Sequence, residues 1–375
     1  MKIGLVCPYN ILAGGGVQEC VFALQVELES RGHTVRILSP RPRGYRNEPP
    51  SGVVFVGSAA KVKSFHTTSQ ISATAEATAV DELLAQEEFD ILHFHEPWVP
   101  FVSRQILTRS NTCNIATFHA KLPEGRVNRT IEKVITPYTS SILKYFDGLT
   151  AVSDAATEYV KTLTDEDITV VPNGIDLNKY RRGKSSSKIS NKKTRRLLYI
   201  GRLERRKGLV HLLDAFKYLQ SECAIDNVQL DIVGSGPDEK RLRRYIMLHD
   251  IPNITFHGYV SEEKKITLLQ KADVFCSAAI YGESFGIVLL EAMAMGTPTV
   301  AADNAGYTSV LKDRGSISIV NPKNTAAFAE RLQMFLTDES IRRAWQDWAT
   351  DYVKQFTYSD IAKQYLDVYK AICKK

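Results

Sequence analysis

Short apolar runs separated by helical segments recur along the chain, and this alternation restricts the possible fold more than any other feature. In the first half the runs predict strands at residues 3–8, 34–39, 53–56, 90–95, 115–119, 148–152 and 168–171. The runs are short and do not alternate with polar residues, which is typical of parallel strands covered by helices on both faces. The first intervening helix is expected over residues 17–31 and ends before Gly32.

The alternation starts again after a basic, Ser-rich stretch. Strands are expected at residues 197–200, 229–233, 254–260, 274–278, 299–302 and 317–320, and helices at 209–222, 238–249, 263–271, 286–295 and 325–336. Two such series predict an α/β chain with two doubly wound domains, residues 1–172 and 173–357, that face each other across a cleft. The last helical stretch, residues 358–375, is followed by no strand and is expected to return to the first domain.

Length and cysteine usage support a globular, intracellular chain. With 375 residues and 44% hydrophobic content, the chain is large enough for two cores. No apolar run approaches the roughly 18 residues of a transmembrane helix, and the apolar start is too short for a signal peptide. The six cysteines are scattered without a CxxC pair, which predicts reduced thiols in a cytoplasmic protein: Cys7, Cys20, Cys113, Cys223, Cys276 and Cys373.

The net charge of +6 is concentrated in one stretch. Residues 181–196 hold eight Lys or Arg and no acid, so the rest of the chain stands at +6 − 8 = −2. A solvated surface loop explains this run, and so does attraction to an anionic membrane, worth about 1 kcal/mol per basic residue. Nucleic acid is disfavoured because no aromatic residues interleave with the charges.

Two carboxylates, Glu283 and Glu291, stand with seven residues between them around the start of an apolar helix. Glu283 lies in a loop between Gly282 and Gly286, where the backbone can approach a ligand closely. The free amides at the helix start favour phosphate or hydroxyl oxygens. A capped, buried helix that follows a strand explains the same residues equally well.

A basic pair follows the first strand of the second half. Arg202 is expected at the carboxyl end of that strand, where open α/β sheets bind ligands, and Lys207 at the start of the next helix. The planar guanidinium of Arg202, which can donate two parallel hydrogen bonds, and the mobile ammonium of Lys207 together suit a diphosphate. A basic surface loop is the alternative, and Arg205 and Arg206 are expected to face solvent.

Two further segments favour a nucleotide ligand. Residues 14–16 are three glycines before a helix, so backbone amides can reach an anion, although the spacing is not GxGxxG and a plain turn fits as well. The second strand ends without an acid to hold a ribose, which disfavours a dinucleotide dehydrogenase. Glu262 and Lys265 suit contacts to the edge of a nucleotide base. A carboxylate can accept hydrogen bonds from the N–H donors of guanine, whereas uracil has only one such donor. A helix capped by Ser261 explains them equally.

Three histidines lie on predicted strands of the first half. His119 ends its strand, where it suits a hydrogen bond to a sugar hydroxyl or to a developing charge, and a structural role fits as well. His93 and His95 share one strand face. They lack a third ligand at a recognisable spacing, so no metal site is predicted.

Taken together, these motifs resemble the retaining GT-B glycosyltransferases of family 4 over essentially the whole length. The similarity is closest to the phosphatidylinositol mannosyltransferases of actinobacteria. The matching runs are residues 4–9, 15–18, 92–97, 116–119, 201–208, 234–236 and 282–291.

The resemblance implies a fold, a reaction and a location. The fold is two facing Rossmann-like domains, with the acceptor bound by residues 1–172 and the nucleotide sugar by residues 173–357. The reaction is transfer of mannose from GDP-mannose to a membrane lipid such as phosphatidylinositol, with α linkage. It implies a front-side displacement in which the leaving phosphate takes the acceptor proton, and no metal cofactor. The protein is expected in the cytoplasm, peripherally bound to the inner face of the membrane.

The resemblance also assigns roles to residues of this chain. Its catalytic set is His119, Arg202, Lys207 and Glu283. Gly16, Arg202 and Lys207 bind the diphosphate, Glu291 the ribose, and Glu262 with Lys265 the guanine. The transferred sugar contacts Glu283 and the amides of Phe285 and Gly286, its 6-hydroxyl reaches His119, and Ile287 completes the donor-binding set. Tyr9 and Gln18 line the inositol pocket of the acceptor.

Two departures from the mannosyltransferases leave alternatives open. Residues 72–86 carry three acids and no base where those enzymes have a basic, membrane-binding helix, and residues 120–126 are not Thr/Ser-rich. In place of that basic helix, we hypothesise that other basic residues attract the protein to the membrane. These are residues 181–196 together with Lys61, Lys63, Arg126 and Arg129. A transferase that uses UDP-glucose or a UDP-N-acetylhexosamine on a glycolipid or polysaccharide is one alternative. A non-catalytic nucleotide-sugar-binding protein is the other.

Overall fold

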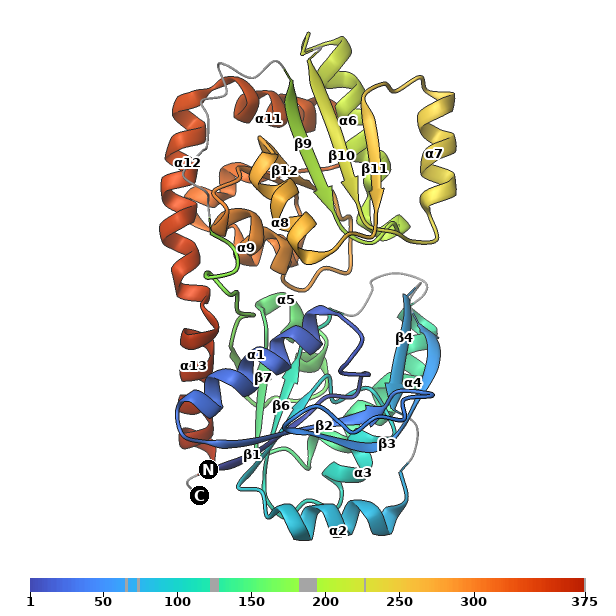
Figure 1. Cartoon of the computed structure of the whole chain (residues 1–375), viewed down its shortest axis with the longest axis vertical. Coiled ribbons are helices and arrows are strands. Elements are labelled where there is room, and N and C mark those ends of the chain that lie inside the picture. The colour runs from blue at the N-terminus through green and yellow to red at the C-terminus, as the bar shows by residue number, and fades with distance from the viewer. Residues whose placement is uncertain (65–66, 73–74, 122–127, 182–193, 226, 374–375) are drawn as a thin grey trace. The chain divides into compact units, whose positions relative to one another are not determined.

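The structure is a computed structural model that describes residues 1–64, 67–72, 75–121, 128–181, 194–225 and 227–373. The chain divides into two compact units, the first formed by Met1–Gly174 with Tyr358–Lys375 and the second by Ile175–Thr357 (Figure 1). Each unit has its own sheet with helices packed against it, so the predicted fold class of two doubly wound units is confirmed.

The sheet of the first unit has the order β4-β3-β2-β1-β5-β6-β7-β8. All neighbouring strands are parallel except the β3–β4 pair, and Leu5 on the central β1 stands opposite Ile37 and His93. The polar, antiparallel β4 was not predicted. It lies at the edge of the sheet, and its sequence, TTSQIS, contains no apolar run that would mark a strand. The strands are β1 Lys2–Val6, β2 Thr34–Arg41, β3 Val53–Ser64, β4 Thr67–Ser72, β5 Ile91–His95, β6 Cys113–Phe118, β7 Gly148–Ala151 and β8 Ile168–Val170.

Helices cover this sheet, and the last helix of the chain is one of them. Val21, Leu24 and Leu28 of α1 pack in the same core as Tyr365 and Tyr369 of α13, as expected for a C-terminal helix that returns to the first unit. The helices of the first unit are α1 Gly16–Ser30, α2 Ala77–Glu87, α3 Val102–Leu107, α4 Asn128–Leu143, α5 Asp154–Thr157, η1 Val160–Thr162 and α13 Tyr358–Ile372.

One cysteine pair is bonded, which corrects the prediction of six reduced thiols. Cys113, at the start of β6, forms a disulfide with Cys373, directly after α13. The two residues are 260 positions apart, so their approach depends on the packing of α13 and not on local spacing. Cys7, Cys20, Cys223 and Cys276 are free thiols.

The sheet of the second unit is entirely parallel, with the order β11-β10-β9-β12-β13-β14. From the central β9 the chain forms β10 and β11 on one side and then crosses over to β12 on the other side of β9, so the strand order reverses at β9. The loops at the carboxyl ends of β9 and β12 therefore flank the usual ligand position of such sheets. The strands are β9 Arg195–Ile200, β10 Val228–Val233, β11 Ile254–Gly258, β12 Val274–Ser277, β13 Thr299–Ala302 and β14 Ile319–Val320.

The helices of this unit agree with the expected series apart from two additions, α10 and α12. They are α6 Leu209–Ser221, α7 Glu239–Leu248, α8 Glu262–Lys271, α9 Ile287–Ala294, α10 Ala305–Val310, α11 Thr325–Thr337 and α12 Glu339–Tyr352, with short 3₁₀ turns η3 Arg205–Lys207, η4 Asp313–Ser318 and η5 Val353–Phe356. None of the helices within the described ranges is long and apolar enough to cross a membrane.

Candidate active site

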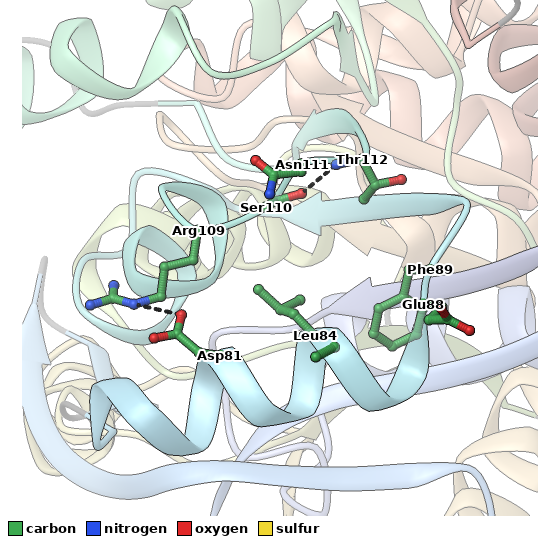
Figure 2. A pocket seen from close by; sticks show the side chains of 9 residues that line it. Asp81, Leu84, Glu88, Phe89, Arg109, Ser110, Asn111 and Thr112 are labelled. Carbon is green, nitrogen blue, oxygen red and sulfur yellow. Dashed lines mark hydrogen bonds and ion pairs between the residues drawn. The ribbon is translucent and has the colours of Figure 1, made fainter.

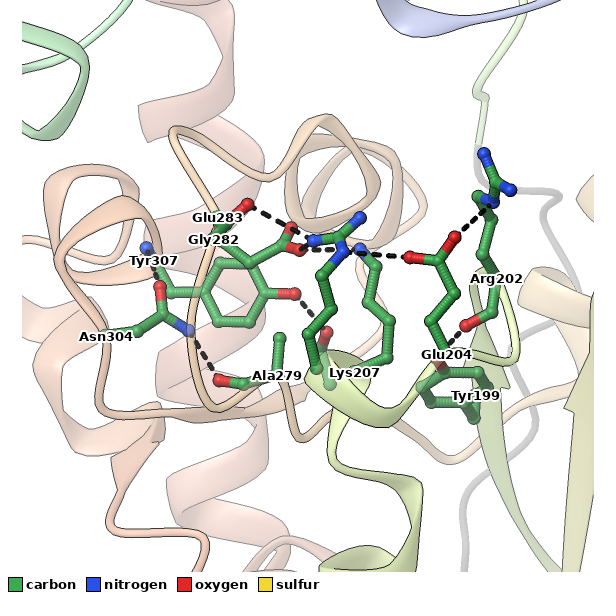
Figure 3. Close-up of polar contacts among 11 residues, drawn as sticks. Tyr199, Arg202, Glu204, Lys207, Ala279, Gly282, Glu283, Asn304 and Tyr307 are labelled. Carbon is green, nitrogen blue, oxygen red and sulfur yellow. Dashed lines mark hydrogen bonds and ion pairs between the residues drawn. The ribbon is translucent and has the colours of Figure 1, made fainter. Parts of the chain in front are cut away.

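The charged residues predicted to contact the donor diphosphate and the transferred sugar meet at the carboxyl ends of β9 and β12. Arg202 and Lys207 come from the loop and 3₁₀ turn after β9, and Glu283 comes from the loop after β12. Because β9 and β12 are parallel neighbours, both loops leave the same edge of the sheet (Figure 3).

Glu283 is held by two cations. The Nζ of Lys207 and the Nη1 of Arg206 each lie 2.7 Å from its Oε1 (Figure 3). Burial alone would raise the pKa of this carboxyl, but Lys207 and Arg206 outweigh burial and lower it. Glu283 is therefore a buried anion at neutral pH.

Arg206 was expected to face solvent, and that prediction is wrong. Its Nε donates to the buried Glu204 at 2.9 Å, and its Nη1 also donates to the carbonyl of Gly282 at 3.2 Å. The side chain is 21% exposed, against 81% for Arg205. In a 3₁₀ turn, successive side chains point about 120° apart, so η3 turns Arg206 and Lys207 inward while Arg205 remains outside.

Arg202 is joined to the same cluster through Glu204. Its Nε lies 2.9 Å from Glu204 Oε1, and its side chain remains 47% exposed. The five side chains Arg202, Arg206, Lys207, Glu204 and Glu283 carry three positive and two negative charges, a net of +1. Glu204 was not predicted, because an acid two residues after Arg202 carries no motif of its own.

Two hydrogen bonds from α10 and its cap fix the start of the loop that carries Glu283. Asn304 caps α10 and donates through Nδ2 to the carbonyl of Ala279 at 2.9 Å, while the Tyr307 hydroxyl lies 2.6 Å from Ser277 Oγ (Figure 3). Gly286 caps α9 with a φ of 97°, a value that favours glycine. Phe285 is buried, and Ile287 is the first residue of α9.

A second polar cluster joins the predicted ribose and base residues. Lys265 Nζ lies 2.8 Å from Glu291 Oε1 and 2.9 Å from Glu262 Oε1. The hydroxyl of Tyr180 lies 2.9 Å from Glu291 Oε1 and 2.5 Å from Glu262 Oε1. Ser261 caps α8 as predicted, so the capping role and the clustering of Glu262 both hold.

Opposite charges and hydrogen bonds favour the charged forms of Lys265 and Glu262. Burial alone would lower the pKa of Lys265, but Glu291 and Glu262 raise it. Burial alone would raise the pKa of Glu262, and its bonds to Tyr180 and Lys265 lower it. Tyr180 was missed by the sequence reasoning, because it stands alone between a turn and the basic stretch.

In the first unit, the predicted residues lie at the carboxyl edge of the sheet. Tyr9 and Gln18 flank the start of α1 after β1, where the carbonyl of Tyr9 accepts from Ser39 and Gln18 Nε2 donates to the carbonyl of Asn10 at 3.4 Å. Gly16 is the first residue of α1. His119 follows β6, and β5 lies between β1 and β6, so His119 and Gly16 share one sheet edge.

His119 is buried and held by the last residue of β5 and by the residue that follows this strand. Its Nε2 lies 2.8 Å from His95 Nδ1, and its backbone N–H donates to Glu96. Burial lowers the pKa of His119 to about 4, so the imidazole is neutral at neutral pH. Burial likewise raises the pKa of Glu96 to about 7, although three N–H donors oppose that shift.

A pocket of about 390 Å³ lies at the opposite edge of this sheet, between α2 and the segment that joins α3 to β6 (Figure 2). Arg109 and Asp81 form an ion pair across it at 3.2 Å. Thr112 directly precedes β6, whereas His119 directly follows that strand, so the pocket and His119 lie at opposite ends of β6. The predicted site residues therefore do not line this pocket.

Some predicted features lie outside the described residues. These are most of the basic stretch 181–196, residues 122–127 after His119, and the side chains of Lys61, Lys63 and Arg129. Over the described ranges, no group of three or more His, Cys, Asp and Glu side chains forms a metal site.

Comparison with known proteins gives matches over nearly the whole chain. Residues 14–179 match the family "Glycosyltransferase Family 4" and residues 181–351 match "Glycosyl transferases group 1". A phosphatidyl-myo-inositol mannosyltransferase of Mycobacterium leprae is 33% identical, over 99% of this chain and 97% of that protein.

Two solved structures have the same fold at low sequence identity. Sucrose-phosphate synthase from Thermosynechococcus elongatus has a TM-score of 0.77 and 20% identity, over 99% of this chain and 98% of that one. The Anabaena protein HepE in complex with UDP has a TM-score of 0.72 and 17% identity, over 99% of both chains.

Proposed function

This chain belongs to glycosyltransferase family 4, and on that premise we propose that it transfers mannose from GDP-mannose to a membrane lipid such as phosphatidylinositol, with α linkage. The observation that carries the proposal is the similarity to a phosphatidyl-myo-inositol mannosyltransferase over nearly the full length of both chains. The cluster around Glu283 at the carboxyl ends of β9 and β12 supports it, because it joins cations to a carboxylate at the usual ligand position.

The cations of this cluster would bind and stabilise the leaving diphosphate. Arg202 offers a half-exposed fork, and Lys207 and Arg206 are positioned by Glu283. In the proposed step, the bond from the anomeric carbon to the diphosphate oxygen breaks while the acceptor hydroxyl bonds to the same face of that carbon. The hydroxyl proton passes to the leaving phosphate. Fixed positive charge beside the developing charge accelerates such a step, so we propose that no metal cofactor is required.

The remaining donor contacts would come from α8, α9 and the loop before α9. Glu283 and the amides of Phe285, Gly286 and Ile287 would hold the mannose, because the first amides of α9 have no partner within the helix. Glu291 would bind the ribose hydroxyls. Glu262 and Glu291 both form ion pairs with Lys265, so Glu262 lies close to the proposed ribose site. Its carboxylate would accept hydrogen bonds from the N–H donors of guanine.

The acceptor would bind at the carboxyl edge of the first unit. Tyr9 and Gln18 at the start of α1 would contact the inositol, Gly16 would approach the diphosphate, and His119 would reach the 6-hydroxyl of the mannose. A lipid acceptor would require the protein to work at a membrane, and we propose the inner face of the cell membrane. We propose that basic residues of the stretch 181–196 supply its attraction to anionic lipid.

Transfer of radiolabel into phosphatidylinositol vesicles tests the proposal, with GDP-mannose and UDP-glucose run in parallel. Labelled lipid from GDP-mannose alone is the expected result. Label from UDP-glucose alone would overturn the donor assignment. No labelled lipid, with GDP still raising the thermal unfolding temperature, would overturn the acceptor assignment.

A further inference from the structure

We propose that His95 is a positioning residue that fixes the tautomer and ring orientation of His119, so that His119 presents an N–H donor at the edge of the first unit. The geometry within the first unit carries this inference. Its consequence for catalysis rests on the proposed function.

Strand register brings the two rings together. His95 stands opposite Thr117 in the β5–β6 pair, and His119 lies two residues further along, on the same face. His95 Nδ1 and His119 Nε2 are 2.8 Å apart, and both side chains are buried. One of these nitrogens must carry the shared proton.

The direction of this hydrogen bond follows from the far side of His95. His95 Nε2 is buried and has no hydrogen-bond partner within the described part of the chain. A proton on Nε2 would leave a buried N–H unsatisfied, which is rarer and costlier than an unused lone pair. The proton of neutral His95 therefore lies on Nδ1 and is donated to His119 Nε2. This leaves the proton of neutral His119 on Nδ1.

The neighbouring His93 holds the His95 ring in place. Thr150 Oγ1 donates its proton to the carbonyl of Ala116, so Thr117 must donate to Thr150 and accept from His93 Nε2 at 2.6 Å. His93 Nδ1 then accepts from the Tyr369 hydroxyl at 2.7 Å. His93 is thus fully bonded, and its ring packs 4.2 Å from that of His95, between centroids.

Glu96 fixes the backbone of His119, while His95 fixes its ring. Oε1 of Glu96 accepts from the backbone N–H of His119 and from that of Ala120, the latter at 2.7 Å. Oε2 accepts from the indole of Trp98. Two consecutive residues of the chain therefore hold both parts of His119, which is how a donor is kept in one orientation.

Two substitutions of His95 separate positioning from packing. In H95N, the amide nitrogen takes the place of Nδ1 and can still donate to His119. In H95Q, the amide extends toward the position of Nε2, so the bond to His119 is lost. We expect kcat for mannosyl transfer within about threefold of wild type in H95N and about tenfold lower in H95Q, the equivalent of one hydrogen bond. Equal activity of the two variants would overturn the proposal.

A spectroscopic measurement tests the tautomer independently of activity. In protein labelled with ¹⁵N-histidine, we expect the His119 resonances of an Nδ1–H imidazole, assigned by their absence in H119N. An Nε2–H tautomer in wild type would overturn the inference. If neither sugar donor is turned over, this spectrum still decides the role of His95, so failure of the proposed function is distinguishable. If H95Q does not fold, the wild-type spectrum and the activity of H95N decide.

Discussion

At the scale of single residues, Glu283 shows how burial and charge combine in this molecule. Lys207 and Arg206 keep it ionised inside the second unit, and both cations are also candidates for the diphosphate. We therefore predict that E283A lowers kcat for transfer by about 10²-fold or more, because the sugar loses a preorganised contact. GDP affinity should stay within about threefold, since the cations remain. Transfer assays and calorimetric titration with GDP would measure the two effects.

E263A is a matched control for this experiment. Glu263 lies in the first turn of α8 and is not part of either cluster, so its removal should leave both transfer and GDP binding unchanged. Equal loss of transfer and GDP affinity in E283A would contradict the assignment of Glu283 to the sugar.

Tyr180 leads to a second prediction at this scale. Its hydroxyl has one proton but contacts carboxylate oxygens of both Glu262 and Glu291. A ribose that binds Glu291 must displace this hydroxyl. We predict that Y180F binds GDP more tightly by about 2- to 10-fold, the effect of removing one competing hydrogen bond. Calorimetric titration of wild type and variant with GDP checks this.

Y245F is the matched control, because the hydroxyl of Tyr245 donates to Asp214, away from this cluster. GDP affinity should be unchanged in Y245F. Weaker GDP binding in Y180F would show instead that the phenol contacts the nucleotide directly.

At the scale of elements, the sequence predicts those helices, strands and loops that have a recognisable pattern of apolar, glycine or charged residues of their own. The buried strands β1 and β9 have continuous apolar runs, and α13 has an apolar stripe, so all three were expected close to their observed bounds. The Glu283 loop and the Arg202 turn were expected because glycines and charges mark them.

What could not be predicted depends on partners distant in the sequence. Arg206 turns inward because Glu283 approaches from another loop, and Tyr180 is buried because α8 and α9 bring Glu262 and Glu291 to it. The polar β4 is a strand because β3 pairs with it. None of these contacts leaves a local pattern in the chain.

The disulfide between Cys113 and Cys373 ties one element, α13, to the start of β6. Removing such a bond typically costs about 2–4 kcal/mol of unfolding free energy, because the unfolded chain gains freedom. We predict that C373S lowers the denaturant midpoint of the first unit and speeds hydrogen exchange in α13. C113S should have the same effect, since it breaks the same bond.

C223S is the control, because Cys223 is a free thiol in the second unit and its loss should not affect α13. Thiol titration of the unreduced, denatured protein provides the direct check. Four reactive thiols are expected from the four free cysteines, and six would show that the disulfide does not form.

At the scale of the whole molecule, the two units differ in the groups they bury. The first unit buries His93, His95 and His119, and burial lowers the pKa of all three, to about 4 for His119. The second unit buries Glu283, whose pKa is lowered by Lys207 and Arg206 in spite of burial. Acid should therefore destabilise the two units over different pH ranges.

The sign of the effect follows from proton uptake on unfolding. Below about pH 6.5, each of these histidines binds a proton in the unfolded state but not in the folded state. The free energy of unfolding therefore falls as the pH drops. For His119 the difference between 6.5 and about 4 corresponds to about 3 kcal/mol. Glu96, with its pKa raised to about 7 by burial, opposes this between about pH 7 and 4.5. Among these four groups, three protons against one leave a net uptake of two.

We predict that acid unfolds the first unit before the second. Between about pH 6.5 and 4.5 the first unit should lose stability through its histidines. The contribution of Glu283 to the second unit is lost only below about pH 4.5, where the unfolded carboxyl takes up a proton that the folded one does not bind. Trp98 lies in the first unit, and Trp345 and Trp348 lie in the second. Fluorescence of W345F/W348F should therefore change at a higher pH than that of W98F, with circular dichroism at pH 7 as the control for folding. Coincident transitions, or an earlier change in W98F, would show that the buried histidines do not set the acid stability of the first unit.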